Sequence, residues 1–159
     1  MRAVLQRVSS ASVTVDGKVT GSIGPGLCVL LGVSRTDGDS EAEWLADKIV
    51  HLRIFEDNEG KHLTGPSSIR GLLLAVSQFT STAIAQRDCC PSFVAADPGE
   101  ANRLYEVFKK AVADRGVPVE SGVFQAHMMV EINNDGPVTL LLEREGTAPE
   151  TEGCGMNEV

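Results

Sequence analysis

The stretch ASVTVDGKVTGSIGPGLCVLLGV, residues 11–33, decides the fold class of this chain. Apolar and polar residues alternate through residues 11–15 and 18–23, and this two-residue period is typical of strands that bury one face. Asp16–Gly17 lies between the two runs and suits the positive φ angles of a tight hairpin turn. Residues 27–33, LCVLLGV, form a continuous apolar run of strand length. We therefore predict that this last segment is a strand buried on both faces.

Further strands are predicted on both sides of this stretch. Toward the N-terminus, residues 3–8 (AVLQRV) alternate, and residues 71–77 (GLLLAVS) form a second continuous apolar run. Two final strands are predicted in FQAHMMVEIN (124–133) and VTLLLE (138–143), separated by the turn NDGP (134–137). Strands therefore dominate the chain.

Two helices are predicted. Ser40 and Glu43 have the spacing of a capping box, and apolar residues with helical spacing follow, so the first helix is expected over residues 41–51. The second helix has Asp97 as its cap, Pro98 at its first position, and Gly116 and Pro118 after its end. Because strands outnumber helices, we predict a strand-rich α/β fold of three layers, with β-sheet packed on β-sheet and both helices on one outer side.

Length and charge limit the organisation and the partners. The chain has 159 residues, which suits one domain, and its net charge of −8 argues against broad electrostatic binding of nucleic acid. Residues 143–159 hold five Glu and one Arg and so carry −4 of this charge. We place one domain at residues 1–144 and predict that residues 145–159 form an acidic, disordered C-terminal tail.

No metal, cofactor or membrane partner is expected. The four cysteines, Cys28, Cys89, Cys90 and Cys154, match neither a disulfide framework nor a zinc pair, and no two histidines have ligand spacing. No apolar run approaches the roughly 20 residues of a membrane-spanning helix. The N-terminal residues also lack the pattern of a signal peptide. We therefore expect a cytoplasmic protein with reduced cysteines.

One polar cluster is a candidate for chemistry. The apolar run at 71–77 leads directly into Ser77, Gln78, Phe79 and Thr80. A polar segment at the end of a buried strand is a common place for an active site, because the strand fixes the backbone while the loop is open to substrate. Hydroxyl, amide and backbone N–H groups there would stabilise an oxyanion. The alternative is that the hydroxyl groups only satisfy the backbone of a turn.

Several motifs together resemble one family. They are MRAVLQRV (1–8), residues 11–33, RIFEDNEGK (53–61), VSQFT (76–80), PSF (91–93) and NDGPVT (134–139). In this order and at these separations they resemble the D-aminoacyl-tRNA deacylases from Met1 to about Leu142. The resemblance implies a hydrolase that cleaves the ester of D-aminoacyl-tRNA, and of glycine mischarged on tRNA. It also implies a homodimer that uses no cofactor.

The resemblance assigns the site residues. Ser77, Gln78, Phe79 and Thr80 would line the pocket that holds the ester. A Gly136–Pro137 pair with a cis peptide bond would enter that pocket from the partner subunit and leave no space for an L side chain. Phe124 and Met128 would lie near the substrate, although core packing at alternating strand positions explains them equally well.

Two mechanisms and two other functions remain open. Either Thr80 is a nucleophile, or it only lines the pocket while the 2′-hydroxyl of the terminal ribose of tRNA helps to activate water. The other functions are a non-catalytic nucleic-acid-binding module on the same fold and an esterase for small D-amino-acid esters. RDCCPSF (87–93) departs from the family because Cys90 stands where a basic residue is usual. HLTGPSS (62–68) departs as well, and Arg87 would supply a basic group nearby.

Overall fold

The computed structural model describes residues 1–56, 63–66, 71–84, 92–93 and 95–146. These residues contain the helices α1 (Asp39–Val50) and α2 (Pro98–Asp114) and the short 3-10 helix η1 (Phe79–Thr82). The strands are β1 (Arg2–Val15), β2 (Lys18–Ile23), β3 (Gly26–Gly32), β4 (Phe55–Glu56), β5 (Leu63–Thr64), β6 (Leu72–Ser77), β7 (Ala83–Ile84), β8 (Ser92–Phe93), β9 (Val119–Ser121) and β10 (Met129–Glu143). Most of the predicted tail (147–159) lies outside the described ranges, as do Arg87, Cys89 and Cys90.

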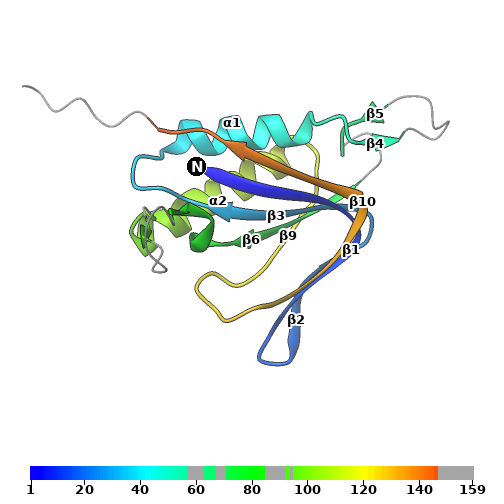
Figure 1. Cartoon of the computed structure of the whole chain (residues 1–159), viewed down its shortest axis with the longest axis horizontal. Coiled ribbons are helices and arrows are strands. Elements are labelled where there is room, and N and C mark those ends of the chain that lie inside the picture. The colour runs from blue at the N-terminus through cyan, green and yellow to red at the C-terminus, as the bar shows by residue number, and fades with distance from the viewer. Residues whose placement is uncertain (57–62, 67–70, 85–91, 94, 147–159) are drawn as a thin grey trace, which may run out of the picture.

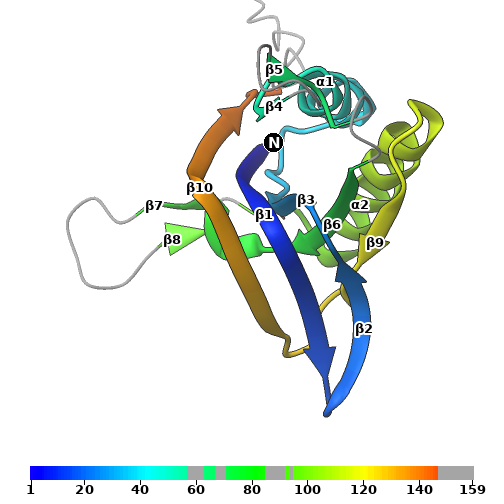
Figure 2. The same cartoon turned by 90° about the vertical axis from the view of Figure 1, so that its right-hand side faces the viewer.

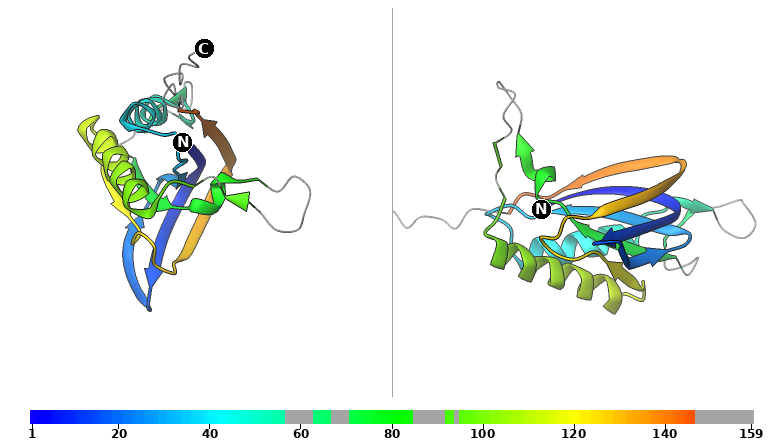
Figure 3. Two further views of the ribbon diagram at one scale, coloured as in Figure 1. Left: turned by 90° about the vertical axis from the view of Figure 1, so that its left-hand side faces the viewer. Right: turned by 90° about the horizontal axis from the view of Figure 1, so that it is seen from below.

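The main sheet has six strands, in the order β10-β1-β3-β6-β9, with β2 also paired to β1 (Figure 1). β1 is antiparallel to β10, β2 and β3, whereas β3 and β6 are parallel, as are β6 and β9. Both helices cover the same face of this sheet (Figure 3). The pairs β4-β5 and β7-β8 form separate two-stranded ribbons.

β1 and β10 are long strands that bend away from the helices (Figure 2). The pairing between them shifts register between Gln6 and Val8 and again between Val8 and Ser10. A strict two-residue period would place Val8 and Ala11 on opposite faces, yet both belong to one buried cluster. The irregularity therefore keeps the apolar side chains on the inner side of the bend. The two strands predicted at residues 3–8 and 11–15 are one bent strand.

Two apolar clusters form the core, one on each face of the sheet. The first lies between the sheet and the helices and includes Leu5, Leu31 and Phe108. The second includes Val8 and Cys28, and the far half of β1, β2 and the first half of β10 enclose it. The strand-rich α/β prediction with both helices on one side is confirmed. The two sheet layers are parts of one continuous sheet, because β1 runs through both.

The helix ends agree with the sequence at α2 and differ at α1. Asp97 caps α2, since its carboxylate accepts a hydrogen bond from the Gly99 N–H at 3.0 Å. α1 begins two residues before the predicted start, and its cap is Gly38 rather than Ser40. The Glu41 carboxylate accepts the Gly38 N–H at 2.9 Å. The capping interaction therefore comes from an acidic residue inside the first turn, which the Ser40 pattern did not indicate.

The last two predicted strands are also different in the structure. Residues 124–126 form a turn and residues 127–128 are irregular, so β10 starts only at Met129, and it continues through NDGP to Glu143 as one strand. Alternation of apolar residues continued through this turn in the sequence, which is why the strand was predicted too early. Within the described residues, neither α1 nor α2 has the length and apolar character that a membrane-spanning helix needs.

Candidate active site

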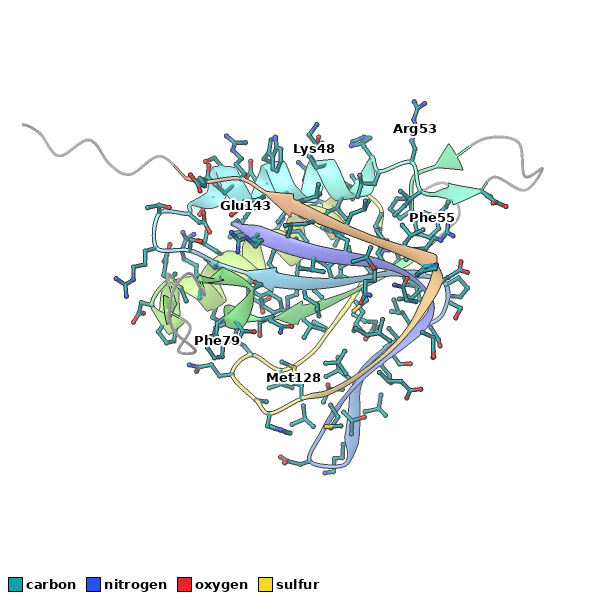
Figure 4. The ribbon with its side chains drawn as sticks, in the orientation of Figure 1. Lys48, Arg53, Phe55, Phe79, Met128 and Glu143 are labelled. Carbon is teal, nitrogen blue, oxygen red and sulfur yellow. The ribbon has the colours of Figure 1, made fainter. Side chains whose placement is uncertain are left out.

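A cavity of about 580 Å³ lies between the end of β6, η1, the start of α2 and the loop before β10. Six of the predicted site residues line it, namely Ser77, Gln78, Phe79, Thr80, Phe124 and Met128. Figure 4 shows Phe79 and Met128 on neighbouring segments of this region. Phe124 and Met128 are half-buried wall residues, since they also pack against the apolar clusters.

Hydrogen bonds fix the SQFT segment at the mouth of the cavity. The Gln78 backbone N–H donates to the carbonyl oxygen of Leu31 on β3 at 2.7 Å. The Gln78 side-chain Nε2 donates to Thr80 Oγ1 at 2.9 Å, and Ser81 Oγ donates to the Gln78 carbonyl oxygen at 2.7 Å. Phe79 is 62% exposed. The segment is therefore held by the neighbouring strand and by its own side chains, and it lines the cavity while Phe79 stays largely exposed.

The described residues that line the cavity are all neutral. Burial, together with the nearby Glu106 carboxylate, raises the pKa of Tyr105, so this side chain is an uncharged phenol at neutral pH. Its hydroxyl donates to the Ala75 carbonyl oxygen at 2.8 Å. The walls thus offer hydroxyl, amide and backbone groups. Among the described residues they offer no histidine or carboxylate as a general base.

Gly136–Pro137 lies where β10 departs from its regular pairing with β1. On one side of it, Thr139 pairs with Gln6 of β1, and on the other side Asn134 pairs with Val8. Residues 135–138 therefore loop out of the ladder while their flanks stay paired. We call these four residues the bulge. The Gly136–Pro137 peptide bond is cis, as the resemblance implies.

Arg7 braces the bulge. Its Nε donates to the Asp135 carbonyl oxygen at 3.2 Å and lies 3.3 Å from the Asp135 carboxylate, and its Nη1 donates to the Ile54 carbonyl oxygen at 2.6 Å. Gly136 has φ +120°, and an added Cβ there would lie 2.8 Å from Arg7 Nη2. Position 136 therefore needs glycine both for its backbone conformation and for the space that Arg7 occupies.

Within one chain, the two parts of the predicted site do not meet. Neither Gly136 nor Pro137 lines the cavity that holds the SQFT segment. Phe55, which lines a small hollow together with Asp135, lies at the opposite end of the sheet from Phe79 (Figure 4).

Sequence reasoning missed three residues of these regions. Gln125 lines the cavity with φ 62°, and nothing in its side chain signals such a backbone. Tyr105 has the helical spacing of an ordinary core residue, so the sequence did not indicate that it lines the cavity. Arg7 did leave a signal, because it is a charged residue in an otherwise apolar alternation after Leu5. Among the described residues, no group of three or more His, Cys, Asp or Glu is placed to hold a metal ion.

Known proteins resemble this chain over most of its length. The family model described as D-Tyr-tRNA(Tyr) deacylase matches residues 4–143. A D-aminoacyl-tRNA deacylase of Geobacter sp. (strain M21) is 54% identical over 144 residues, which are 90% of this chain and 97% of that protein. One from Anaeromyxobacter dehalogenans (strain 2CP-C) is 53% identical over 144 residues, again 90% of this chain and 97% of the relative.

Two solved structures share the fold. A structure described as c-Myc DNA Unwinding Element Binding Protein has a TM-score of 0.86 and 41% sequence identity, covering 92% of this chain and all of that one. A probable eukaryotic D-amino acid tRNA deacylase has a TM-score of 0.69 at 17% identity, covering 89% of this chain and 97% of the other. With a family model that spans residues 4–143 and relatives above half identity, this chain belongs to the D-Tyr-tRNA(Tyr) deacylase family.

Proposed function

We propose that this chain hydrolyses the ester that joins a D-amino acid to the 3′-terminal adenosine of tRNA. We extend the proposal to glycine mischarged on tRNA and place the reaction in the cytoplasm. The observation that carries it is the cavity whose polar rim contains the whole SQFT segment, residues 77–80. Its volume is within the roughly 300–1,000 Å³ of small-ligand sites. The family and the names of the relatives support the substrate.

A second copy of the chain would complete the site. Gly136 and Pro137 are exposed on the bulge of the edge strand β10, away from the cavity of their own chain. Leu141 of β10 is 59% exposed, and the same row continues across the sheet through the half-buried residues Val4 and Leu30. Two copies that pack through this apolar row bury it by a two-fold contact. Gly136 and Pro137 of the partner subunit then enter the cavity.

Backbone groups of the bulge would select the chirality of the substrate amino acid. The main-chain carbonyl groups of Gly136 and Pro137 of the partner subunit accept hydrogen bonds from the substrate amino group. The side chain of a D residue then points to the open side of the cavity, whereas an L side chain collides with the bulge. Because the filter rejects by shape and uses no side-chain pocket, it accepts many D residues and also achiral glycine.

The substrate itself would supply the missing catalytic group. The 2′-hydroxyl next to the ester orients a water molecule whose oxygen bonds to the ester carbonyl carbon. The bond from that carbon to the ribose 3′-oxygen breaks, and the 3′-oxygen leaves with the proton from water. Backbone N–H groups near Phe79 stabilise the oxyanion. Thr80 Oγ1 accepts the Gln78 amide N–H, which lowers its electron density, so Thr80 is a poor nucleophile.

The decisive experiment compares release of tyrosine from D-tyrosyl-tRNA and from L-tyrosyl-tRNA under single turnover. The wild-type dimer should cleave only the D ester. Pro137→Ala, and the double variant with Gly136→Ala, should narrow the difference between the two rates. Pro118→Ala is the matched control, since Pro118 is also exposed and lies outside the bulge. Intact D and L esters after incubation with a folded dimer would exclude the proposal.

Replacing the 2′-hydroxyl of the terminal ribose by hydrogen tests the chemistry separately. Loss of a positioned acid-base group typically lowers the rate by about a hundredfold or more. A terminal 2′-deoxyadenosine should therefore slow release to that extent. An unchanged rate would mean that a group of the protein activates the water.

A non-catalytic nucleic-acid-binding module is the second candidate. The observation that favours it is the 41% identical structure named as a DNA unwinding element binding protein. The net charge of −8 disfavours it, because duplex binding depends on neutralising phosphates. Tight binding of duplex DNA at physiological salt, with no ester cleaved, would favour this candidate. Cleavage of free D-tyrosine esters as fast as of D-tyrosyl-tRNA would instead indicate a small-molecule esterase.

A further inference from the structure

A chain with a net negative charge can bind tRNA only where Lys or Arg side chains are available to contact phosphate. Most Lys and Arg side chains among the described residues already form ion pairs with carboxylates. A carboxylate lies within 4.0 Å of Arg2, Arg7, Arg103, Lys109, Lys110, Arg115 and Arg144. Within the part of the chain that the structure describes, no carboxylate lies that close to Lys18, Arg35, Lys48 or Arg53. These four side chains are the candidates for contact with phosphate.

Of these four, Arg35 is bonded to the wall of the active-site cavity. Its Nε donates to the carbonyl oxygen of Ala95 at 3.3 Å, and Ala95 lines the cavity. The backbone on both sides is held as well, since Ser34 forms a β-bridge with Ala95, and the Ala96 N–H donates to the Val33 carbonyl oxygen at 3.0 Å. Main-chain contacts therefore fix the backbone next to Arg35 against the Ala95–Ala96 wall of the cavity.

The other three candidates lie elsewhere. Lys18 follows the turn between β1 and β2, and Lys48 lies over the Trp44 ring at 5.8 Å on α1. Lys48 and Arg53 lie on the side of the molecule away from Phe79 (Figure 4). None of the four candidates lines the cavity itself, and among them Arg35 is the one that donates a hydrogen bond to a residue that does.

The guanidinium of Arg35 retains binding capacity. Only its Nε is used, and no described residue accepts a hydrogen bond from its two terminal nitrogens. The side chain is exposed. Two terminal nitrogens in one plane match two oxygens of a phosphate group, and such bidentate pairs are stronger than a point-charge contact.

We propose that Arg35 binds the phosphodiester that links the terminal adenosine of tRNA to the nucleotide before it. This inference rests on the proposed function, which places the ester in the cavity. The ester is on the 3′ side of the terminal ribose and the phosphate is on its 5′ side, so the first phosphate lies one ribose away from the reacting carbon. With the ester beside the SQFT segment, this phosphate would pass the Ala95 wall of the cavity, to which Arg35 is hydrogen-bonded. Arg35 thereby distinguishes a polynucleotide ester from a small one.

Two substrates and two variants test the assignment. The substrates are D-tyrosyl-tRNA and the D-tyrosyl ester of adenosine, which has no phosphate. Arg35→Gln should lower kcat/KM for D-tyrosyl-tRNA by about tenfold, the size expected for one hydrogen-bonded charge contact. The slope of log kcat/KM against log salt should become shallower by about 0.7 to 1. Cleavage of the adenosine ester should be unchanged. Lys48→Gln makes the same change of charge and should alter neither substrate.

The possible outcomes distinguish a failure of the Arg35 inference from a failure of the proposed function. An equal loss on both substrates would mean that Arg35 acts by holding the Ala95 segment, and no loss on either would mean that it does not contact tRNA. Both results would overturn the inference while leaving the proposed function intact. Wild-type protein that cleaves neither ester would instead refute the proposed function, and the inference would fall with it. Arg35→Lys keeps the charge without the planar fork and should fall between wild type and Arg35→Gln.

Discussion

Replacing Arg7 by glutamine tests how firmly the bulge is held. The guanidinium of Arg7 contacts the Ile54 carbonyl oxygen at 2.6 Å, the Asp135 carbonyl oxygen at 3.2 Å and the Asp135 carboxylate at 3.3 Å. Glutamine is shorter and uncharged, so Arg7→Gln removes all three contacts. We expect a less stable protein and, under the proposed function, a bulge that excludes L side chains less well.

The size of the effect follows from the exposure of each group. The Arg7 side chain is 18% exposed, so its charged hydrogen bond to Ile54 contributes about 1.5 kcal/mol, near the lower end of such bonds. The bond to the Asp135 carbonyl adds about 0.5 to 1 kcal/mol. The Asp135 carboxylate is 58% exposed, and an ion pair that is open to solvent adds only about 0.2 to 0.5 kcal/mol. Together the free energy of unfolding should fall by about 2 to 3 kcal/mol.

Urea unfolding at one fixed protein concentration measures this change, because the apparent stability of the proposed dimer would depend on concentration. Lys110→Gln is the control. It breaks a pair with Asp114 whose side chains are 76% and 60% exposed, and it should cost no more than about 0.5 kcal/mol. The same Arg7→Gln protein should also cleave L-tyrosyl-tRNA relatively faster. A loss of stability no larger than that of Lys110→Gln, or an unchanged ratio of D to L rates, would refute this account of the bulge.

Three further changes have defined outcomes. Gln125→Gly should raise the free energy of unfolding by about 0.5 to 1 kcal/mol, because glycine adopts φ 62° without strain, and a lower urea midpoint would contradict this. Burial raises the pKa of Glu41, but hydrogen bonds from the Gly38 N–H and from Ser40 outweigh it and leave the pKa below its usual value. The stability that the Glu41 carboxylate contributes is therefore full above the unfolded pKa of about 4.3 and is lost as pH falls through the lower folded pKa. The loss of unfolding free energy caused by Glu41→Gln should accordingly shrink from pH 7 to pH 3. A loss that stays the same at both pH values would contradict this coupling of stability to the protonation of Glu41. Thr80→Ala should keep most of the rate of D-tyrosyl-tRNA cleavage, and a folded variant with no chemistry would identify Thr80 as the nucleophile.

Local patterns were sufficient where the structure depends on near neighbours. The hairpin at Asp16–Gly17 has φ angles of 49° and 76°, as the turn pattern predicts, and β3 is almost wholly buried. The Asp97 cap of α2 could also be predicted from the sequence. The bend of β1 could not be predicted, because its register shifts depend on how residues 2–15 pair with a strand more than a hundred positions away.

The sequence likewise predicts some parts of the candidate site and not others. The SQFT segment follows a buried strand, so its place at the end of β6 could be predicted from hydrophobicity alone. The cis bond at Gly136–Pro137 came from the family resemblance, because most X–Pro bonds are trans. The contacts of Arg7 and Arg35 are with backbone carbonyl oxygens distant in sequence, at Ile54, Asp135 and Ala95. Backbone acceptors carry no side-chain signature, so no motif could have indicated these pairs.

The bulge on β10 also affects how the sequence can vary. Thr139 and Asn134 keep their partners on β1, so the four residues between them are an insertion that the ladder tolerates. Replacements at the tip and replacements in the two core clusters should then have additive effects, because the two groups share few contacts. Among the described side chains, Arg7 links Asp135 of the bulge to the body of the sheet, and the Asn134 side-chain oxygen accepts the Val138 N–H at 3.2 Å. Position 136 itself needs glycine, but the bulge is otherwise coupled to the scaffold mainly through these two side chains, so covariation between the bulge and the scaffold should be concentrated at positions 7 and 134.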